Sequence, residues 1–582
     1  MGKKLLLTVA SFLLVFIISP LPAKASLEFK TKSSIIYQLG PRGNAEIEQK
    51  VSLTNNFSNI YPKEYQLKIE KEEIENIVAH DKLGNIVKKI TKNSEFTEIQ
   101  LSFNQEVVGK GEKLDFEIHY SLPKFAVKKG QVWEITIPGI NNLEEVEELT
   151  LTVKAPPSFG KLAYSSRPIA SSETEAGWQL ISYHKKQINT RPLILAFGEF
   201  QIFDFDLSFF LENSKDQSEV VEIPIPPDTA YQSIVLEEIT PKPETVALDS
   251  DFNWLARYRL NPEETKNIRV KGQAKIFPQP ENLPFVNASK TTDFSPYLKA
   301  DTYWEADNPT IRELVQKINK PKTIQDFIVS QMDYELGDVT SIKRVGAVEA
   351  YRLKKGVCTE FSDLFVTLAR ASGIPAREIE GFAFTENQKL VSLAVDNDVL
   401  HSWVEYWDDQ KSAWIPADPT WAETTDGIDF TQGFDLGHFA FVIHGLNSDY
   451  PYPPGFYKTD QKQKNVSIEF ASQLVSQPEI ELVPSLVKSE NIILLKIKNN
   501  SLAAAYQPKI KIKTAKADQR EVAINVLPPL GEEKTEIKKP NIFQTVFTKP
   551  QLEVIINQDY FVLDYPDFKL NFLSFFANLF KK

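Results

Sequence analysis

The chain has 582 residues, of which 42% are hydrophobic, and this length is sufficient for several domains that each bury a core. Its formal net charge of −12 argues against nucleic acid as a partner and against simple electrostatic binding to anionic lipid. A single cysteine excludes a disulfide within the chain.

Residues 1–25 have the pattern of a secretory signal. Two lysines precede an apolar stretch over residues 5–18, and the sequence PAKA at 22–25 supplies small residues for cleavage. We expect cleavage rather than an uncleaved anchor, because the apolar stretch is barely long enough to span a bilayer. Loss of three lysines leaves 63 of the 66 basic residues against 78 acidic ones. The expected location is therefore secreted or in the cell envelope, outside the cytoplasm.

Two β-rich regions are predicted next, in a chain that we expect to be multidomain. Alternating runs such as AEIEQKVSL (45–53) and LDFEIHY (114–120), with Gly, Asn and Pro between them, predict a β-sandwich over residues 26–198. Further strands predict a second β-region over 199–290, either a separate sandwich or the completion of the first. The proline-rich segment 277–284 reads as the linker to the centre of the chain.

Apolar residues at helical spacing predict helices over 308–318 and 323–334, at the start of a central region that we place at 291–456. The only cysteine, Cys358, opens a third predicted helix, which Gly373 and the following proline end. A thiol in the first turn of a helix is favoured as the nucleophilic thiolate, although nearby acidic residues oppose that effect. The alternative is a small buried hydrophobic residue.

A β-hairpin is predicted downstream of this helix. The run HSWVEYW (401–407) and a second strand at 413–420 are joined by the turn-prone sequence DDQK (408–411). The hairpin would bring Asp418 beside His401. With Cys358 these residues have the roles of a nucleophile, a base and an orienting carboxylate, although each one alone is more often structural.

Four blocks of the central region resemble the bacterial transglutaminase-like superfamily: GVCTEF (356–361), ASGIPAR (371–377), HSWVE (401–405) and WIPADPT (414–420). The resemblance implies a papain-like α+β core in which the helix of the nucleophile packs against an antiparallel sheet. It also implies that Cys358 attacks a carboxamide carbonyl to form a thioester. In that scheme His401 takes and returns the proton, and Asp418 orients the imidazole.

The resemblance leaves the reaction open. Thr359 follows the nucleophile where animal transglutaminases have tryptophan, and the superfamily also contains amidases, peptidases and inactive members. We expect a cysteine enzyme that acts on protein or peptide amide bonds by transamidation, deamidation or hydrolysis. The alternative is a catalytically inactive transglutaminase-like scaffold or adhesion protein. Tyr334 and Trp304 are candidate oxyanion donors, or ordinary core aromatics. No cofactor or metal is predicted, since the acidic run 426–429 lacks the spacing of a calcium loop.

The C-terminal part begins after the boundary segment DYPYPPG (449–455). Alternating runs predict an immunoglobulin-like β-sandwich over residues 466–566. In residues 567–582 the phenylalanines fall on one face of a predicted amphipathic C-terminal helix, about 22 Å long over its last fifteen residues. That helix suits contact with a membrane surface or docking on its own domain.

Overall fold

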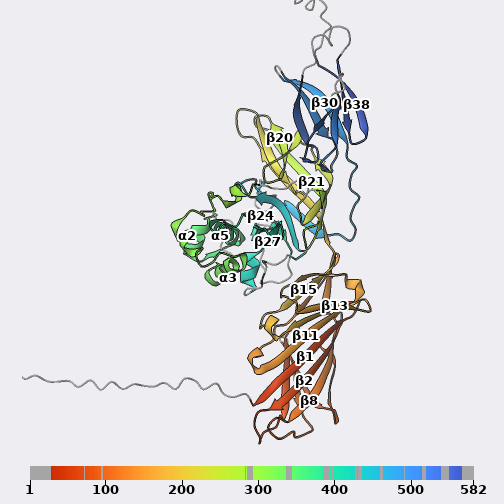
Figure 1. Ribbon diagram of the computed structural model, residues 1–582, viewed down its shortest axis with the longest axis vertical. Helices are drawn as coiled ribbons and strands as arrows, with labels where there is room; N and C mark the ends of the chain where they lie inside the picture. The colour runs from red at the N-terminus through yellow and green to blue at the C-terminus, as the bar shows by residue number, and fades with distance from the viewer. Residues whose placement is uncertain are drawn as a thin grey trace, which may run out of the picture.

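The computed structural model describes residues 28–70, 73–93, 96–281, 283–284, 293–335, 344–384, 393–395, 398–425, 429, 431, 435–458, 463–489, 492–513, 519–538 and 550–566. Its β-regions follow one another along the long axis, and the helices project to one side near the middle (Figure 1). The prediction of a mostly β chain with a central α+β region is confirmed.

The N-terminal region consists of strands and short 3-10 helices. Their bounds are β1 (Phe29–Leu39), β2 (Ala45–Asn55), β3 (Glu64–Glu70), β4 (Glu75–Asp81), β5 (Gly84–Asn85), β6 (Val87–Lys92), β7 (Phe96–Ser102), β8 (Lys113–Leu122), β9 (Ala126–Lys129), β10 (Val132–Ile137), η1 (Leu143–Glu145), β11 (Val146–Ala155), η2 (Pro157–Phe159), β12 (Leu162–Ser165), β13 (Ser171–Glu175), β14 (Trp178–His184), η3 (Lys185–Gln187) and β15 (Leu193–Phe197).

Eight of these strands form one sheet in the order β13-β14-β11-β1-β2-β8-β4-β5. Strand β2 shows why the sheet has two different faces, because its odd-numbered residues are buried and its even-numbered residues are not. The buried face shares a hydrophobic core with the sheets β12-β15-β10-β9 and β3-β7-β6. The opposite face carries charged and polar side chains.

The second β-region contains β16 (Gln201–Glu212), β17 (Glu219–Ile225), β18 (Gln232–Thr240), β19 (Thr245–Leu248), β20 (Trp254–Leu260), β21 (Thr265–Ile276) and β29 (Val466–Phe470). They form the sheets β18-β21-β16-β29 and β17-β20-β19, which share a core. We expected the strand at Val466 to open the C-terminal module. The structure instead pairs it with β16, from Phe203 opposite Phe470 to Leu207 opposite Val466, because the chain returns to this sheet after the central region.

The central region contains the elements η4 (Ser295–Leu298), α2 (Pro309–Leu314), α3 (Pro321–Gln331), β22 (Asp333–Tyr334), α4 (Ala347–Leu353), β23 (Lys355–Gly356), α5 (Cys358–Ala371), β24 (Ala376–Ala383), β25 (Leu393–Val395), β26 (Asp398–Asp408), β27 (Ala413–Ala417), α6 (Pro419–Thr424) and β28 (His438–His444). The sheet order is β25-β26-β24-β28, with β27 paired to β26. Two predicted helices are shorter than expected. Helix α3 ends at Gln331 because Met332 is extended and β22 pairs with β23, and α2 ends at Leu314.

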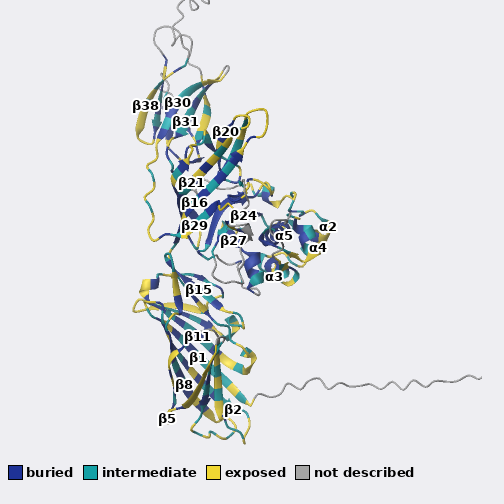
Figure 2. Ribbon diagram, turned by 180° about the vertical axis from the view of Figure 1, so that it is seen from behind, coloured by how far each residue is buried: buried dark blue, intermediate teal, exposed yellow. Residues whose placement is uncertain are grey.

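Helix α5 packs on the sheet against the neighbouring strands β24 and β26, and a hydrophobic core lies between the helix and the sheet. Phe361, Leu364 and Phe365 are fully buried and share this core with Val404 of β26. The helix begins where Glu360 Oε2 accepts a hydrogen bond from the Val357 N–H at 3.1 Å, a capping interaction at its first turn. Figure 2 shows that buried residues dominate α5 and β24, whereas exposed and intermediate residues are frequent on β1, β2 and β8.

The C-terminal module contains β30 (Leu482–Ser489), β31 (Ile492–Asn499), β32 (Ala505–Tyr506), β33 (Ile510–Lys513), β34 (Gln519–Val522), β35 (Val526–Leu527), β36 (Glu532–Ile537), β37 (Gln551–Ile556) and β38 (Asp559–Asp564). The sheets β30-β31-β36 and β34-β33-β37-β38 share one core. Its assignment as immunoglobulin-like stays a prediction.

The predicted signal at 1–25 and the predicted helix at 567–582 lie outside the described residues. Among the helices that are described, none combines the length and the hydropathy needed to cross a membrane.

Candidate active site

Cys358 is the first residue of α5, and it is only 1% exposed. Burial raises the pKa of its thiol, and the charges of Glu360 and Asp418 raise it further, while a hydrogen bond from the Ser402 backbone N–H lowers it. The position at a helix start predicted a stabilised thiolate, but burial outweighs that effect here. A neutral thiol needs a base to take its proton as the sulfur attacks.

The predicted hairpin of β26 and β27 brings His401 and Asp418 together. Val404 pairs with Ala417 across the two strands, and His401 Nε2 lies 2.8 Å from Asp418 Oδ2. Both side chains are fully buried. Asp418 Oδ1 also accepts the Trp421 N–H at 2.9 Å, which caps α6 and fixes the rotation of the carboxylate.

The ionisation of Asp418 determines which ring nitrogen of His401 carries a proton and which can accept one. Burial raises the pKa of Asp418, but the attraction and hydrogen bonds of His401 and His438 outweigh it and hold that pKa below its ordinary value. An ionised Asp418 only accepts hydrogen bonds, so His401 Nε2 carries a proton. His401 Nδ1 is buried and has no hydrogen-bond partner among the described residues. The backbone N–H of the next residue, Ser402, lowers the pKa of the Cys358 thiol, which indicates that base and thiol belong to one site.

A second histidine completes what we call the buried cluster, namely His401, Asp418 and His438. His438 Nε2 is 3.3 Å from Asp418 Oδ2, and its Nδ1 is 2.8 Å from Asp435 Oδ1. Burial lowers the pKa of His438, but the charges and hydrogen bonds of Asp435 and Asp418 outweigh this effect and raise the pKa to about 9. His438 is therefore protonated at neutral pH and donates to both carboxylates. Sequence reasoning missed this role, because no local motif links β28 to the hairpin.

Aromatic rings enclose the buried cluster. The ring of Trp421 is 5.4 Å from that of His401 and 4.4 Å from that of His438, and the ring of Trp403 is 5.0 Å from that of His438. These rings remove water from the cluster, which strengthens the electrostatic interactions within it.

The two candidate oxyanion donors differ in the structure. Trp304 Nε1 donates to Asp363 Oδ1 at 3.0 Å, so this N–H is already used. The Tyr334 hydroxyl is buried and has no hydrogen-bond partner among the described residues. Burial raises its pKa, and the charges of Cys358, Asp418 and Glu360 add to that shift. The pairing of Tyr334 with Gly356 places this residue beside the segment that leads into Cys358.

Ser402 is anchored by a buried polar network beneath the site. Its hydroxyl donates to Glu378 Oε1 at 2.7 Å, and its oxygen lies 2.9 Å from Ser362 Oγ. Glu378 Oε2 is in turn paired with Arg344 at 2.6 Å, and Arg344 also binds Asp363. This network holds the strand segment whose N–H faces the Cys358 sulfur.

Comparisons with known proteins concern this central region. Residues 307–419 match the family model of the Transglutaminase-like superfamily. An uncharacterized protein of Haemophilus influenzae is 31% identical over 144 residues, covering 22% of this chain and 36% of that protein. A protein-glutamine gamma-glutamyltransferase of Pseudomonas aeruginosa is 32% identical over 83 residues, covering 14% of this chain and 12% of that protein. The chain thus spans well under half the length of these two relatives.

A similar solved structure is the "Putative Cysteine Protease" of Cytophaga hutchinsonii. It is 17% identical with a TM-score of 0.30, covering 47% of this chain and 98% of that chain. The family match is more informative because it includes all three residues that the motifs singled out. Residues 307–419, with Cys358, His401 and Asp418, form a transglutaminase-like superfamily domain.

Proposed function

We propose that the protein is a cysteine enzyme that acts on protein or peptide amide bonds through Cys358, His401 and Asp418. The observation that carries the proposal is the 2.8 Å contact between His401 Nε2 and Asp418 Oδ2, which leaves the second imidazole nitrogen without a partner among the described residues. A neutral imidazole fixed in this tautomer accepts a proton at Nδ1.

In the proposed reaction Cys358 Sγ attacks the carbonyl carbon of a carboxamide while His401 Nδ1 takes the thiol proton. The oxyanion forms beside the Tyr334 hydroxyl and the backbone N–H groups at the start of α5. Collapse breaks the C–N bond, and His401 returns its proton to the leaving nitrogen, which departs as ammonia or an amine. The product is a thioester on Cys358.

The thioester is then transferred to an amine or to water. An amine acceptor gives transamidation, and water gives deamidation of a glutamine side chain or hydrolysis of a peptide bond. The name of the Pseudomonas aeruginosa relative supports the first outcome, whereas Thr359 in place of tryptophan leaves the other two open. Since Cys358 is 1% exposed, the site has to open before any carbonyl reaches the sulfur.

The competing proposal is a nonreactive transglutaminase-like scaffold, which the burial of the thiol favours. A test independent of substrate is the rate of iodoacetamide alkylation of Cys358 in the wild type and in His401→Ala. An enzyme is expected to lose alkylation rate near neutral pH in the variant, because the thiol loses its base. Equal slow rates in both proteins would favour the scaffold.

Turnover identifies the acceptor. We would incubate the full chain with a glutamine-containing peptide, with and without a primary amine, and measure ammonia release, amine incorporation and peptide cleavage. Cys358→Ala is expected to abolish all three, whereas His184→Ala, an exposed histidine of the N-terminal region, serves as the matched control. A wild-type protein inactive on a broad glutamine-peptide library would count against the proposal.

We further propose a secreted or envelope location, supported by the pattern of residues 1–25. In that setting the β-regions, including an immunoglobulin-like C-terminal module, would act as spacers or present the substrate. Residues 567–582 would contact a membrane surface through their phenylalanines. Deleting residues 568–582 should lower retention of the protein on liposomes, and unchanged retention would remove this part of the proposal.

A further inference from the structure

The outer face of the eight-stranded sheet carries a second group of two histidines and one carboxylate, far from the active site in the chain. His80 of β4 pairs directly with Glu117 of β8, and His119 lies two residues further along β8 on the same face. We call His80, Glu117 and His119 the outer cluster. Their side chains are 42%, 35% and 39% exposed, so the cluster is open to solutes.

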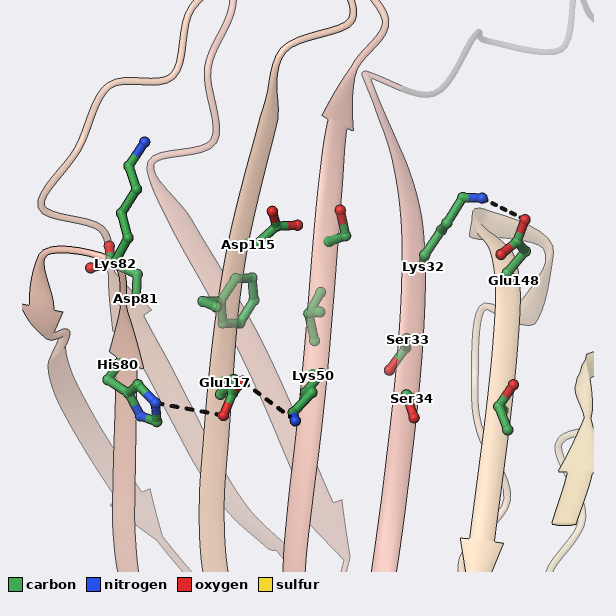
Figure 3. Close-up of a pocket in the computed structure, with 14 residues that line it drawn as sticks. Lys32, Ser33, Ser34, Lys50, His80, Asp81, Lys82, Asp115, Glu117 and Glu148 are labelled. Atoms are coloured by element: carbon green, nitrogen blue, oxygen red, sulfur yellow. Dashed lines mark hydrogen bonds and ion pairs between the residues drawn. The ribbon is translucent and has the colours of Figure 1, made fainter.

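Both imidazoles are directed at the same carboxylate oxygen. His80 Nε2 is 3.5 Å and His119 Nε2 is 3.4 Å from Glu117 Oε2. Figure 3 shows His80 and Glu117 reaching toward each other between their strands. One ligand atom from each of the three residues lies within 4.8 Å of the other two.

These separations fit the ligand shell of a metal ion better than they fit hydrogen bonds. Ligands about 2.0 to 2.2 Å from a tetrahedral zinc ion are about 3.3 to 3.6 Å from one another. The two contacts in the buried cluster are shorter, 2.8 Å from His401 and 3.3 Å from His438 to Asp418, and both are hydrogen bonds. The remaining edge between the two imidazoles, at most 4.8 Å, needs only a small rotation of exposed rings.

The surroundings orient the carboxylate and leave room for a further ligand. Lys50 Nζ is 3.6 Å from Glu117 Oε1 and 2.8 Å from Glu48 Oε1, so it holds the carboxylate oxygen that does not face the histidines. Glu48 pairs with His119 in the register of β2 and β8. His80, Lys50 and Glu117 also line a trough of about 630 Å³ on this face (Figure 3).

We propose that the outer cluster binds a divalent transition-metal ion of the zinc type. Two imidazole nitrogens and one carboxylate oxygen supply three protein ligands, a set that favours zinc over calcium or magnesium, which prefer all-oxygen shells. The fourth position faces the trough and takes water or a carboxylate of a bound molecule. Lys32, Lys50 and Lys82 line the trough together with Asp81, Asp115 and Glu148, so a ligand there meets charges of both signs.

The test uses the full chain, first stripped of metal with a chelator. Titration with Zn²⁺ by calorimetry should give one site, and Co²⁺ should give the visible absorption bands of a tetrahedral complex. His80→Ala and Glu117→Gln should each weaken binding by at least about tenfold, the lower end of the loss seen for outer-shell partners of metal ligands. Glu117→Gln keeps the shape of the side chain, so it retains the fold.

The matched control is His184→Ala, which removes another histidine of the same sheet, on β14, and should leave metal binding unchanged. Equal loss in this variant, or no saturable binding by the wild type, would overturn the proposal. Binding that survives His80→Ala but disappears in His401→Ala would move the metal to the buried cluster and would also overturn it.

Discussion

The buried and outer clusters contain the same groups, two imidazoles and one carboxylate, in opposite environments. In the buried cluster the side chains are at most 1% exposed, and the contacts are 2.8 and 3.3 Å. In the outer cluster the side chains are 35% to 42% exposed, and the contacts are 3.4 and 3.5 Å. Burial without water forces every proton to have a defined position, whereas an exposed group can exchange protons, water or a metal ion.

This difference in burial suits the buried cluster to proton transfer and the outer cluster to metal binding. A proton-transfer site needs one fixed tautomer, which the buried cluster obtains from Asp418 and from a protonated His438. A metal site needs ligands that can turn and room for a further ligand, and the exposure of the outer cluster allows both. The predictions below alter each feature separately.

The largest expected effect comes from Asp418→Asn. The amide oxygen can still cap α6, but the amide donates where the carboxylate accepted, so His401 is driven to the other tautomer and loses its free nitrogen. We expect kcat to fall by about 10³- to 10⁴-fold. Stability should also fall by about 3 kcal/mol, because protonated His438 loses one of its two buried carboxylates. Peptide turnover and the urea midpoint measure the two effects, and a small loss of kcat would contradict the assigned tautomer.

The charge on His438 should appear in the pH dependence of stability. Its pKa of about 9 in the folded protein exceeds the ordinary value of about 6.5, so its contribution is complete below pH about 6.5 and is lost as the pH rises through about 9. His444, with a pKa also raised to about 9, titrates in the same window. The free energy of unfolding should fall by a few kcal/mol between pH 7 and 9.5. Tryptophan fluorescence during urea unfolding reports it, since five of the eight tryptophans lie in residues 291–456.

His438→Gln separates the two histidines. At pH 7 it should destabilise the central region by about 3 kcal/mol, because it removes a charge buried between two carboxylates. It should also reduce the loss of stability between pH 7 and 9.5. His444→Gln is the control, because it removes the titration of His444 and leaves that of His438. An unchanged pH slope in both variants would show that neither histidine is charged in the folded protein.

Tyr334→Phe and Trp304→Phe distinguish the two candidate oxyanion donors. Tyr334→Phe removes a hydroxyl without a partner in the described structure, so stability should be unchanged or slightly higher while kcat falls by about 10²-fold. Trp304→Phe leaves Asp363 without one donor and should cost about 1–3 kcal/mol of stability with little change in kcat. The opposite result would exchange their roles.

The sequence predicted the parts of the site that depend on local pattern. Helical spacing after Cys358, and two strands joined by a short turn, were enough to bring Asp418 to His401, because a hairpin register follows from a short loop. Alternation likewise predicted β2 and β8 with their buried and exposed faces.

The remainder depends on contacts between distant segments, which periodicity does not encode. His438 reaches Asp418 only because β28 pairs with β24, on the edge of β24 that faces away from β26. The pairing of β29 with β16 joins one segment that precedes the central region in the sequence to one that follows it. The thiol pKa depends on how completely α5 is covered, and a single sequence gives the helix start but not its burial.

The smallest expected effect is that of His80→Gln on stability, and it tests whether burial distinguishes the two clusters. His80→Gln should change the free energy of unfolding by less than about 1 kcal/mol in metal-free protein, because exposed imidazole–carboxylate contacts contribute little. The same substitution at His438 removes a fully buried partner and should have a several-fold larger effect. If the metal proposal holds, adding Zn²⁺ should stabilise the wild type but not His80→Gln, since only a protein that binds the ion gains from mass action. Equal sensitivity of the two histidines in metal-free protein would mean that burial is not what separates the clusters.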